Sequence, residues 1–365
     1  SGAYEGMVRA EEDPSVKAVV ITGNGRAFIA GADISEFGGS GEGHNLNEVF
    51  KKIEFSSKPV VAAINGLALG GGLETALCCN YRIASAEAFM GLPEVNLGLL
   101  PGAGGTQRLP RLIGPSEALK MIISGAHISA KKAHSLGIVD LISENILEDS
   151  IKFALNKANS SESHPKVRDL NDKVIEARGS DNVLIEAKAL AAKTRKGQFA
   201  PGQIIKCVEA AIDCDDFDEG LKKEGAYFLE CLMHPQREAM IHIFFGERAA
   251  SKILDVPKET QLKKINRAAV IGSGTMGGGI AMCFANAGIP VHIIDQDSDN
   301  LKRGIGVIES NYNYMVKRGR INENQKNAIF GLISSSLKYE DIKDVDIVIE
   351  AVYENLELKT SIFKS

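Results

Sequence analysis

Short apolar runs alternate with amphipathic stretches through the first half of the chain. The run VKAVVITGNG (16–25) is rich in β-branched residues and ends at a glycine turn, and KPVVAAINGLA (58–68) is almost wholly apolar. Such runs are typical of parallel strands buried on both faces. Helical patterns follow, one starting at Ser116 and ending at Gly125, the next capped by Ser129 and ending at Gly137. The alternation predicts an α/β fold with a largely parallel sheet.

The pattern changes twice further along the chain. Residues 156–200 are rich in Lys, Asn, Ser and Glu without apolar periodicity, so we expect an exposed edge to a first domain spanning 1–195. Apolar residues then recur at threes and fours, which predicts a helical linker over 196–264. A strand, a glycine turn and a helix open a second α/β unit, 265–365.

Composition narrows the class of protein. Of the 365 residues, 44% are hydrophobic and 24% are charged, as in ordinary globular proteins. The net charge of -5 argues against a nucleic-acid surface, and the stretch 59–73 is too short and too broken to span a membrane. The six cysteines show no ligand or disulfide spacing, which favours reduced thiols without a metal. Small anionic ligands remain compatible with this composition.

The stretch ALGGGLETAL (68–77) holds three consecutive glycines, Gly70 to Gly72, followed by Glu74 in the first turn of a predicted helix. Glycine amides approach a ligand closely, and the first amides of a helix have no intrahelical partner. The small residues Ala30 to Ala32 would bring a second amide close. Two such donors on one carbonyl oxygen stabilise an enolate, each by about 3 kcal/mol.

A second acid, Glu94, follows a proline in the glycine-rich stretch 91–105, which has no other charge. Two carboxylates at an apolar pocket can divide the work of adding water, with no need for a metal. The simpler interpretation is that Glu74 only balances a helix dipole and Glu94 only occupies a turn. The glycines would then serve close packing alone.

Four segments in order decide between these interpretations: AGADI, NGLALGGGLE, GLPEVNLGLLPGAGGTQRLPR and SGAHISAKKAHSLGIVD. Together they resemble the crotonase (enoyl-CoA hydratase/isomerase) superfamily over residues 16–145. The resemblance implies the crotonase fold of ββα spiral units, backbone oxyanion donors at Ala32 and Gly71, and hydratase carboxylates at Glu74 and Glu94. It also implies hydration of a trans-2-enoyl-CoA to an L-3-hydroxyacyl-CoA, with 3-enoyl-CoA isomerisation as a second activity of the same pocket.

The second unit opens with AAVIGSGTMGGGIA (268–281), a GxGxxG spacing between a strand and a helix. The residues expected to meet the phosphates of a dinucleotide are Gly272, Gly274, Thr275, Met276 and Gly277. The next strand ends at Asp295, where an acid binds the adenosine ribose and favours NAD over NADP. A glycine cluster that serves packing alone is the weaker alternative.

A third strand is predicted in DVDIVIEAVYENLELK (344–359), whose segment VIEAVYE resembles 3-hydroxyacyl-CoA dehydrogenases. The resemblance implies that Glu350 and Glu354 lie near the nicotinamide of NAD. That family's catalytic histidine lies downstream of this chain, and His292 is interpreted as structural. The two parts together resemble the multifunctional enzymes of fatty-acid β-oxidation, which are peroxisomal in eukaryotes and cytoplasmic in bacteria.

The pattern suggests that the chain is truncated at both ends, because the hydratase part lacks its first strand and helix and the dehydrogenase part stops early. We therefore expect a partial NAD-binding domain. Acyl-CoA is the expected partner, and oligomerisation is open. The alternatives are mainly an enoyl-CoA isomerase, another crotonase reaction, or a non-catalytic acyl-CoA or NAD-binding module. Two costly acids in one apolar pocket argue against a mere binder.

Overall fold

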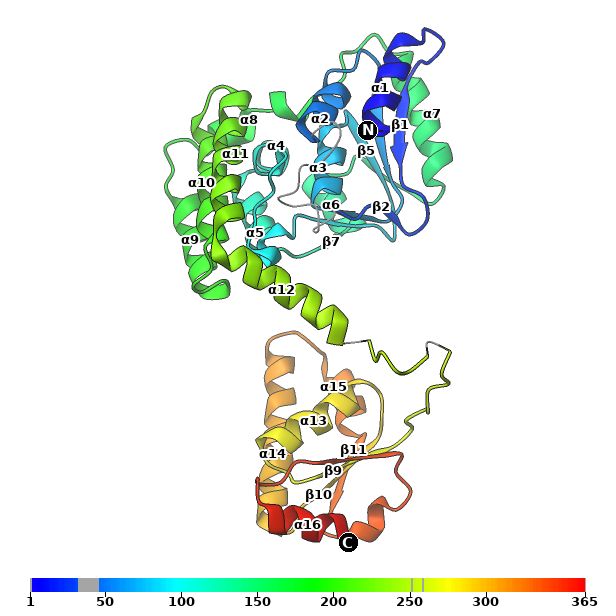
Figure 1. Cartoon of the computed structure of the whole chain (residues 1–365), viewed down its shortest axis with the longest axis vertical. Helices are drawn as coiled ribbons and strands as arrows, with labels where there is room; N and C mark the ends of the chain where they lie inside the picture. Colours follow the sequence, from blue (N-terminus) through cyan, green and yellow to red (C-terminus); the bar gives the residue numbers. More distant parts are fainter. Residues whose placement is uncertain (1, 32–45, 251, 258, 365) are drawn as a thin grey trace. The chain divides into compact units, whose positions relative to one another are not determined.

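The chain folds into two compact units, Ser1–Ile253 and Leu254–Ser365 (Figure 1). The computed structural model describes residues 2–31, 46–250, 252–257 and 259–364. Within this part of the chain, no helix is both long and apolar enough to cross a membrane.

The described residues of the first unit form two four-stranded sheets. The first has the order β1 (Val19–Thr22), β3 (Val60–Ile64), β5 (Tyr81–Ser85) and β8 (Leu141–Ser143), all parallel. The second has the order β2 (Ala27–Ile29), β4 (Leu67–Leu69), β6 (Phe89–Gly91) and β7 (Ile128–Ser129), with only the last pair antiparallel. The predicted parallel α/β fold is confirmed.

The two strands predicted from the apolar runs pair with each other, Val19 opposite Val60. Every residue of β3 is buried, as predicted, because this strand lies inside its sheet. Strand β1 is only partly buried, which differs from the prediction, because it forms the edge of the same sheet.

Helices pack around these sheets and between them. They are α1 (Gly2–Glu12), α2 (Leu46–Glu54), α3 (Gly71–Cys78), α4 (Gly105–Ile113), α5 (Pro115–Ser124), α6 (Ala130–Leu136), α7 (Ile146–Ala158), α8 (Asp172–Glu176) and α9 (Asn182–Thr194), with short 3₁₀ turns η2 (Glu94–Leu97) and η3 (Val167–Asp169). The predicted caps are present: the Ser129 side chain accepts from Lys132 N, and Gly125 and Gly137 end their helices with positive φ. Helix α5 begins at Pro115, one residue before the predicted start.

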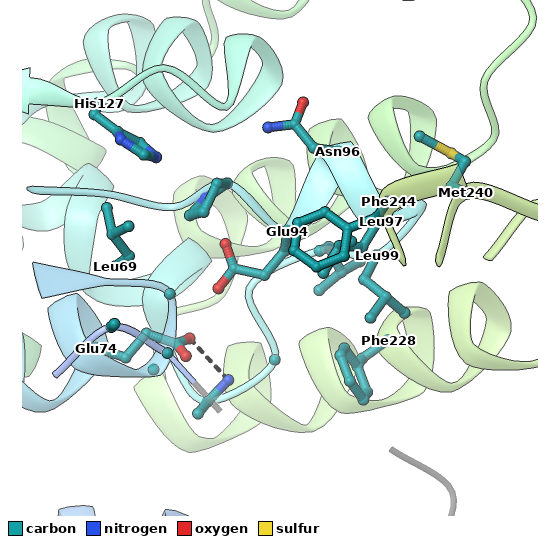
Figure 2. Close-up of a pocket in the computed structure, with 18 of the residues that line it drawn as sticks. Leu69, Glu74, Glu94, Asn96, Leu97, Leu99, His127, Phe228, Met240 and Phe244 are labelled. Atoms are coloured by element: carbon teal, nitrogen blue, oxygen red, sulfur yellow. Dashed lines mark hydrogen bonds between the residues drawn. The ribbon is translucent and has the colours of Figure 1, made fainter. Parts of the chain in front are cut away.

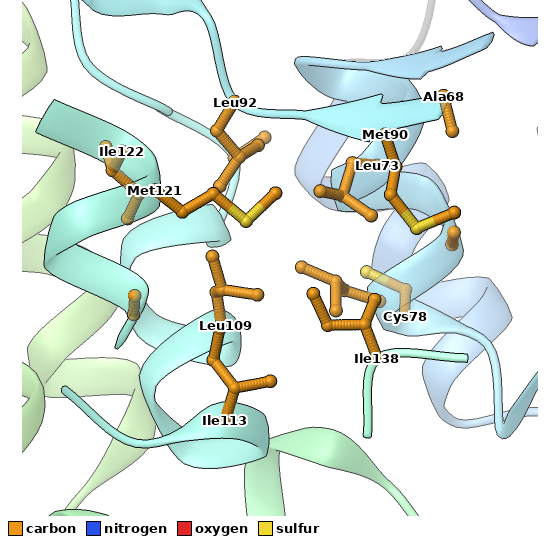
Figure 3. Packing of buried hydrophobic residues seen from close by; sticks show 14 of the residues in the cluster. Ala68, Leu73, Cys78, Met90, Leu92, Leu109, Ile113, Met121, Ile122 and Ile138 are labelled. Atoms are coloured by element: carbon orange, nitrogen blue, oxygen red, sulfur yellow. The ribbon is translucent and has the colours of Figure 1, made fainter. Parts of the chain in front are cut away.

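The core of the first unit includes the contact of the second sheet and helix α3 with helices α4 and α5. Leu73 and Met90 approach it from one side, Leu109 and Met121 from the other (Figure 3). Each buried side chain of this size stabilises the fold by about 1.5–3 kcal/mol. This packing fixes the start of α3, where the glycine cluster lies.

The segment 196–264, predicted as a helical linker, does not form a linker in the structure. It forms α10 (Ala200–Asp213), α11 (Phe217–Met233) and α12 (Pro235–Ala250), all inside the first unit. Ile204 and Val208 of α10 are fully buried in the core described above. Helix α10 is amphipathic and buries its apolar face against α4 and α5, so it is part of the first unit's core.

The second unit is a parallel four-stranded sheet in the order β11 (Ile333–Ser336), β10 (Val291–Ile294), β9 (Ala268–Ile271) and β12 (Ile347–Glu350). Its helices are α13 (Thr275–Asn286), α14 (Ser298–Lys317), α15 (Glu323–Phe330) and α16 (Leu356–Lys364), with a 3₁₀ turn η4 (Tyr339–Ile342). The strand predicted within 344–359 is confirmed as β12, but its place as third along this unit is wrong, because β11 precedes it. That strand reads ISSS, and at the sheet edge it needs little apolar surface.

Candidate active site

The glycine cluster forms the turn between β4 and α3. Gly70 has φ 55°, a conformation that side chains disfavour, and it precedes the helix. A Cβ on Gly72 would lie 2.0 Å from the carbonyl oxygen of Ile29, so β2 packs directly on this turn. Gly71 is the first residue of α3, and its amide therefore has no intrahelical acceptor. Close packing of the glycines is therefore present, while the use of the Gly71 amide as an oxyanion donor stays a prediction.

Glu74 lies in the first turn of α3 and is only 3% exposed. Its Oε1 accepts hydrogen bonds from the amides of Ala103 and Gly105, each at 2.8 Å. Burial raises the pKa of Glu74, and these two amides offset part of that rise.

Glu94 begins the 3₁₀ turn η2, directly after Pro93, and is half-buried. Its Oε2 is buried and has no hydrogen-bond partner among the described residues. Burial first, and then the charge of Glu74, raise the pKa of Glu94 well above its ordinary value. Unlike Glu74, Glu94 accepts from no amide of another described segment that would hold its charge, so Glu94 keeps its proton more readily.

Both acids line one cavity of about 1030 Å³, and Figure 2 shows them among the other residues that line it. Gly70 and Gly71 line it as well, together with Ala30 and Gly31 at the end of β2. The apolar wall includes Leu69, Leu97, Leu99, Phe228, Met240 and Phe244, the last three from α11 and α12. The predicted donor Ala32 lies outside the described residues.

One buried acid near this cavity escaped the sequence analysis. Glu224 of α11 is fully buried, and it accepts hydrogen bonds from the amides of Gly104 (2.6 Å) and Thr106 (3.1 Å). A signal did exist, because Glu224 shares a helical face with the buried residues Phe217 and Cys231. A charged residue on an otherwise buried face indicates a polar partner.

In the second unit the predicted cofactor residues gather at one edge of the sheet. Ile294 and Glu350 lie opposite Ile271 in the two neighbouring strands, so Gly272, Asp295 and Glu350 share the carboxyl edge. Ligands of such sheets bind at this edge. Gly272 has φ 104°, and a Cβ on Gly277 would lie 1.8 Å from the Gly272 carbonyl oxygen, as a tight glycine turn requires.

A cavity of about 470 Å³ at this edge is lined by Gly274, Thr275 and Asp295, and also by Arg303 of α14. Asp295 Oδ2 accepts from both the amide and the hydroxyl of Ser273, at 2.9 and 2.6 Å. Partial burial opposes the ionisation of Asp295, but these hydrogen bonds prevail and lower its pKa.

The remaining predicted residues of this site lie outside that cavity's lining. Met276 is 70% exposed, and Glu350 and Glu354 both form ion pairs with Lys359, at 3.0 and 2.8 Å. His292 contacts the hydroxyls of Ser334 and Ser336 on the neighbouring strand, which confirms its structural role.

Comparison with known proteins identifies the two units separately. Residues 4–203 match the family described as "Enoyl-CoA hydratase/isomerase", which is more than half of the chain. The chain belongs to the enoyl-CoA hydratase/isomerase family. Residues 267–365 match a second description, "3-hydroxyacyl-CoA dehydrogenase, NAD binding domain". The predicted order of a hydratase part followed by an NAD-binding part is confirmed.

Relatives of this hydratase/isomerase family member combine both parts. The "Peroxisomal bifunctional enzyme" of Danio rerio is 41% identical over 368 residues, 98% of this chain and 49% of that protein. The "Peroxisomal fatty acid beta-oxidation multifunctional protein" of Oryza sativa subsp. japonica is 37% identical over 376 residues, 99% of this chain and 51% of that protein. The chain thus spans about half the length of the curated relatives it matches.

A solved enoyl-CoA hydratase structure from Geobacillus kaustophilus HTA426 is 32% identical to this chain. The match covers 67% of this chain and 84% of the other, with a TM-score of 0.41.

Proposed function

We propose that this chain hydrates trans-2-enoyl-CoA thioesters to L-3-hydroxyacyl-CoA, a step of fatty-acid β-oxidation. The observation that supports the proposal is one largely apolar cavity lined by two acids, Glu74 and Glu94, and by Gly71, the first residue of α3. Membership of the hydratase/isomerase family supports it, as do the names of the relatives.

The thioester carbonyl of the substrate would accept a hydrogen bond from the Gly71 amide. By the family resemblance, the Ala32 amide is the second donor. Both donors act on the negative charge that develops on this oxygen when water attacks the double bond. Each is expected to stabilise the transition state by about 3 kcal/mol.

The two acids have unlike surroundings, which assigns them different roles. Glu74, held by two amides, serves as the base that accepts a proton from water as its oxygen bonds to the β-carbon. Glu94, whose pKa is raised further, serves as the acid that protonates the α-carbon. Glu74 gains one proton and Glu94 loses one, so a single proton transfer between them restores the starting state.

The second unit is proposed to hold NAD at the turn Gly272 to Gly277, with Asp295 on the adenosine ribose. The residues present fit NAD, because the turn is close-packed at its glycines and the ionised Asp295 lines the cavity beside it. When bound, NAD supplies a hydride acceptor for 3-hydroxyacyl-CoA, the product of the first unit. Glu350 and Glu354 are proposed to face the nicotinamide end.

The names of the relatives also support a location. Both relatives described above are named peroxisomal, and we propose the peroxisome for this chain if its source is a eukaryote. A bacterial source would favour the cytoplasm.

The test is hydration of a short trans-2-enoyl-CoA, followed as loss of the conjugated thioester absorbance. Wild type is compared with Glu74→Gln and Glu94→Gln, which keep the shape of each side chain and remove its acid–base function. Each variant is expected to lose at least about a hundredfold in kcat. Glu230→Gln on α11, an exposed acid, serves as the matched control.

Two other outcomes would change the assignment. If only Glu94→Gln abolishes turnover and a 3-enoyl-CoA is the better substrate, the site is mainly an isomerase. If the folded wild type binds the thioester and never converts it, the site is a binding module, and the proposal is overturned.

A further inference from the structure

The two buried acids Glu74 and Glu224 share one short loop. Going along the chain, the amides of Ala103 and Gly105 donate to Glu74, while those of Gly104 and Thr106 donate to Glu224. The Thr106 hydroxyl also donates to Glu224 Oε2. We propose that Glu224 is a positioning residue: it anchors the loop 103–106 so that the alternate amides hold the Glu74 carboxylate in place for hydration.

The loop 103–106 has little rigidity of its own. It belongs to the stretch PGAGGT (101–106), and glycine has more backbone freedom to lose than any other residue. Helix α4 begins within it, at Gly105, and its N-cap residue Gly104 has no side chain that could cap the helix. Glu224 supplies the missing acceptor from another helix, so the loop conformation depends on α11.

Thr106, which donates to Glu224, is itself held by further hydrogen bonds. Thr106 Oγ1 accepts from Gln107 Nε2 at 3.1 Å, and the same amide group donates to the Cys207 carbonyl on α10 at 2.9 Å. The hydroxyl therefore has its proton directed at Glu224. This chain of hydrogen bonds ties the loop to α10 as well as α11.

The cost of burying Glu224 supports a specific role. It is fully buried, and within the described residues none of the ion pairs involves it. Burial and the charge of Glu74 raise the pKa of Glu224 to about 8. Charged or titratable groups facing it are Glu74 of α3, Glu94 of η2, Arg108 of α4 and Cys207 of α10. An apolar residue would fill this helix face at lower cost.

The hydrogen bond at Gly104 also affects the orientation of the Gly105 amide, because peptide units are planar and neighbouring units share a Cα. If Gly104 loses its acceptor, the plane that carries the Gly105 amide turns with it. Most of the substrate contacts proposed for the cavity, the Gly71 amide among them, lie on segments other than the loop, and of residues 103–106 Ala103 alone lines the cavity. Loss of Glu224 is therefore expected to lower kcat and to leave KM for the enoyl-CoA nearly unchanged.

The test uses Glu224→Gln at a pH above the Glu224 pKa of about 8, where both oxygens of the wild-type carboxylate accept, whereas the amide nitrogen of the variant faces a donor and cannot accept from it. This inference rests on the proposed hydratase function, and kcat is expected to fall between about tenfold and about a hundredfold. The variant Glu74→Gln/Glu224→Gln should lose no more than Glu74→Gln alone, because Glu224 acts through Glu74. Glu230→Gln on the same helix is the control and should match wild type.

A second measurement does not need activity. Amide hydrogen exchange of peptides covering 101–113 should rise in Glu224→Gln and not in Glu230→Gln, while the rest of the first unit stays protected. Unchanged exchange, or a loss of kcat that adds to that of Glu74→Gln, would overturn the positioning role. A wild type without hydratase turnover would instead overturn the proposed function, and the exchange result would still decide whether Glu224 anchors the loop.

Discussion

Gly105 and Glu74 lie in direct contact: the Gly105 amide donates to Glu74 Oε1 at 2.8 Å, and a Cβ at position 105 would lie 2.8 Å from that same oxygen. The loop thus holds this carboxylate and leaves no space beside it. Any side chain at position 105 therefore has to displace either the loop or the Glu74 carboxylate.

Gly105→Ala should damage the site directly. The added methyl would also lie 2.8 Å from Cβ of Pro101, so neither neighbour can yield easily. We expect a loss of about 1–3 kcal/mol in the free energy of unfolding and a fall of at least about tenfold in kcat. Urea unfolding and the hydration assay measure the two.

Gly225→Ala on α11 is the matched control for that variant. A Cβ there meets nothing within 4 Å, and alanine in a helix interior is favoured by about 0.5–1 kcal/mol. If both variants behave alike, the contact between Gly105 and Glu74 has no functional importance.

Stability should depend on pH through Glu224. The unfolded chain loses this proton near its ordinary pKa of 4.5, whereas the folded chain keeps it until about 8. Between these values the folded state binds more protons, so the free energy of unfolding falls as pH rises. Burial raises the pKa of Glu74 and Glu94 in the same direction.

Glu224→Gln removes one of these three contributions. The drop in unfolding free energy between about pH 5 and about pH 8 should therefore be smaller than in wild type. Urea titrations at the two pH values measure it, with Glu230→Gln as the control. An equal drop in all three proteins would contradict the assignment.

A buried ion pair secures the same loop from the side of α2. Glu54 accepts from Arg108 Nε and Nη2 at 2.9 and 2.8 Å, and Arg108 also donates to the Ala103 carbonyl. Glu54→Gln leaves the arginine charge buried without its counter-charge, and we expect a loss of about 3–5 kcal/mol in the free energy of unfolding.

The exposed pair of Glu117 and Lys120, 2.7 Å apart, provides the comparison for Glu54→Gln. Glu117→Gln should cost less than about 1 kcal/mol in the same urea titration. Similar losses for both variants would mean that burial adds nothing to the Glu54 pair.

In the second unit, Asp295→Ala should weaken NAD binding. A hydrogen bond to a charged group contributes about 1.5–3 kcal/mol, which corresponds to a rise in Kd of roughly tenfold or more. Titration of the chain with NADH, followed by its fluorescence, measures this. Asp344→Asn, an exposed acid of the same unit, should bind NADH as wild type does. An unchanged Kd for Asp295→Ala would place the ribose elsewhere.

Several features could be predicted from the sequence because they depend on residues near in the chain. The buried strand β3, the Ser129 cap, the glycine ends of α5 and α6, and the place of Glu74 in the first turn of α3 all follow from local pattern. Strand β11 was missed because its ISSS sequence carries almost no apolar signal.

The linker prediction for 196–264 shows where local pattern stops being informative. The sequence shows the amphipathic period of α10, but it does not show which surface the apolar face of this helix covers. Only the fold brings Ile204 and Val208 into the core between α4 and α5. A helical face with apolar residues needs a partner, but the period does not say which.

The two α/β units, the glycine turns and the acids Glu74 and Glu94 could be predicted because each depends on neighbours a few residues away. The surroundings of those acids could not, because they arise only when distant segments pack together. Glu224 lies 120 positions from Gly104 in sequence, yet the two are hydrogen-bonded. The protonation of a buried acid depends on the dipoles and charges packed around it, and those come from distant segments of the chain.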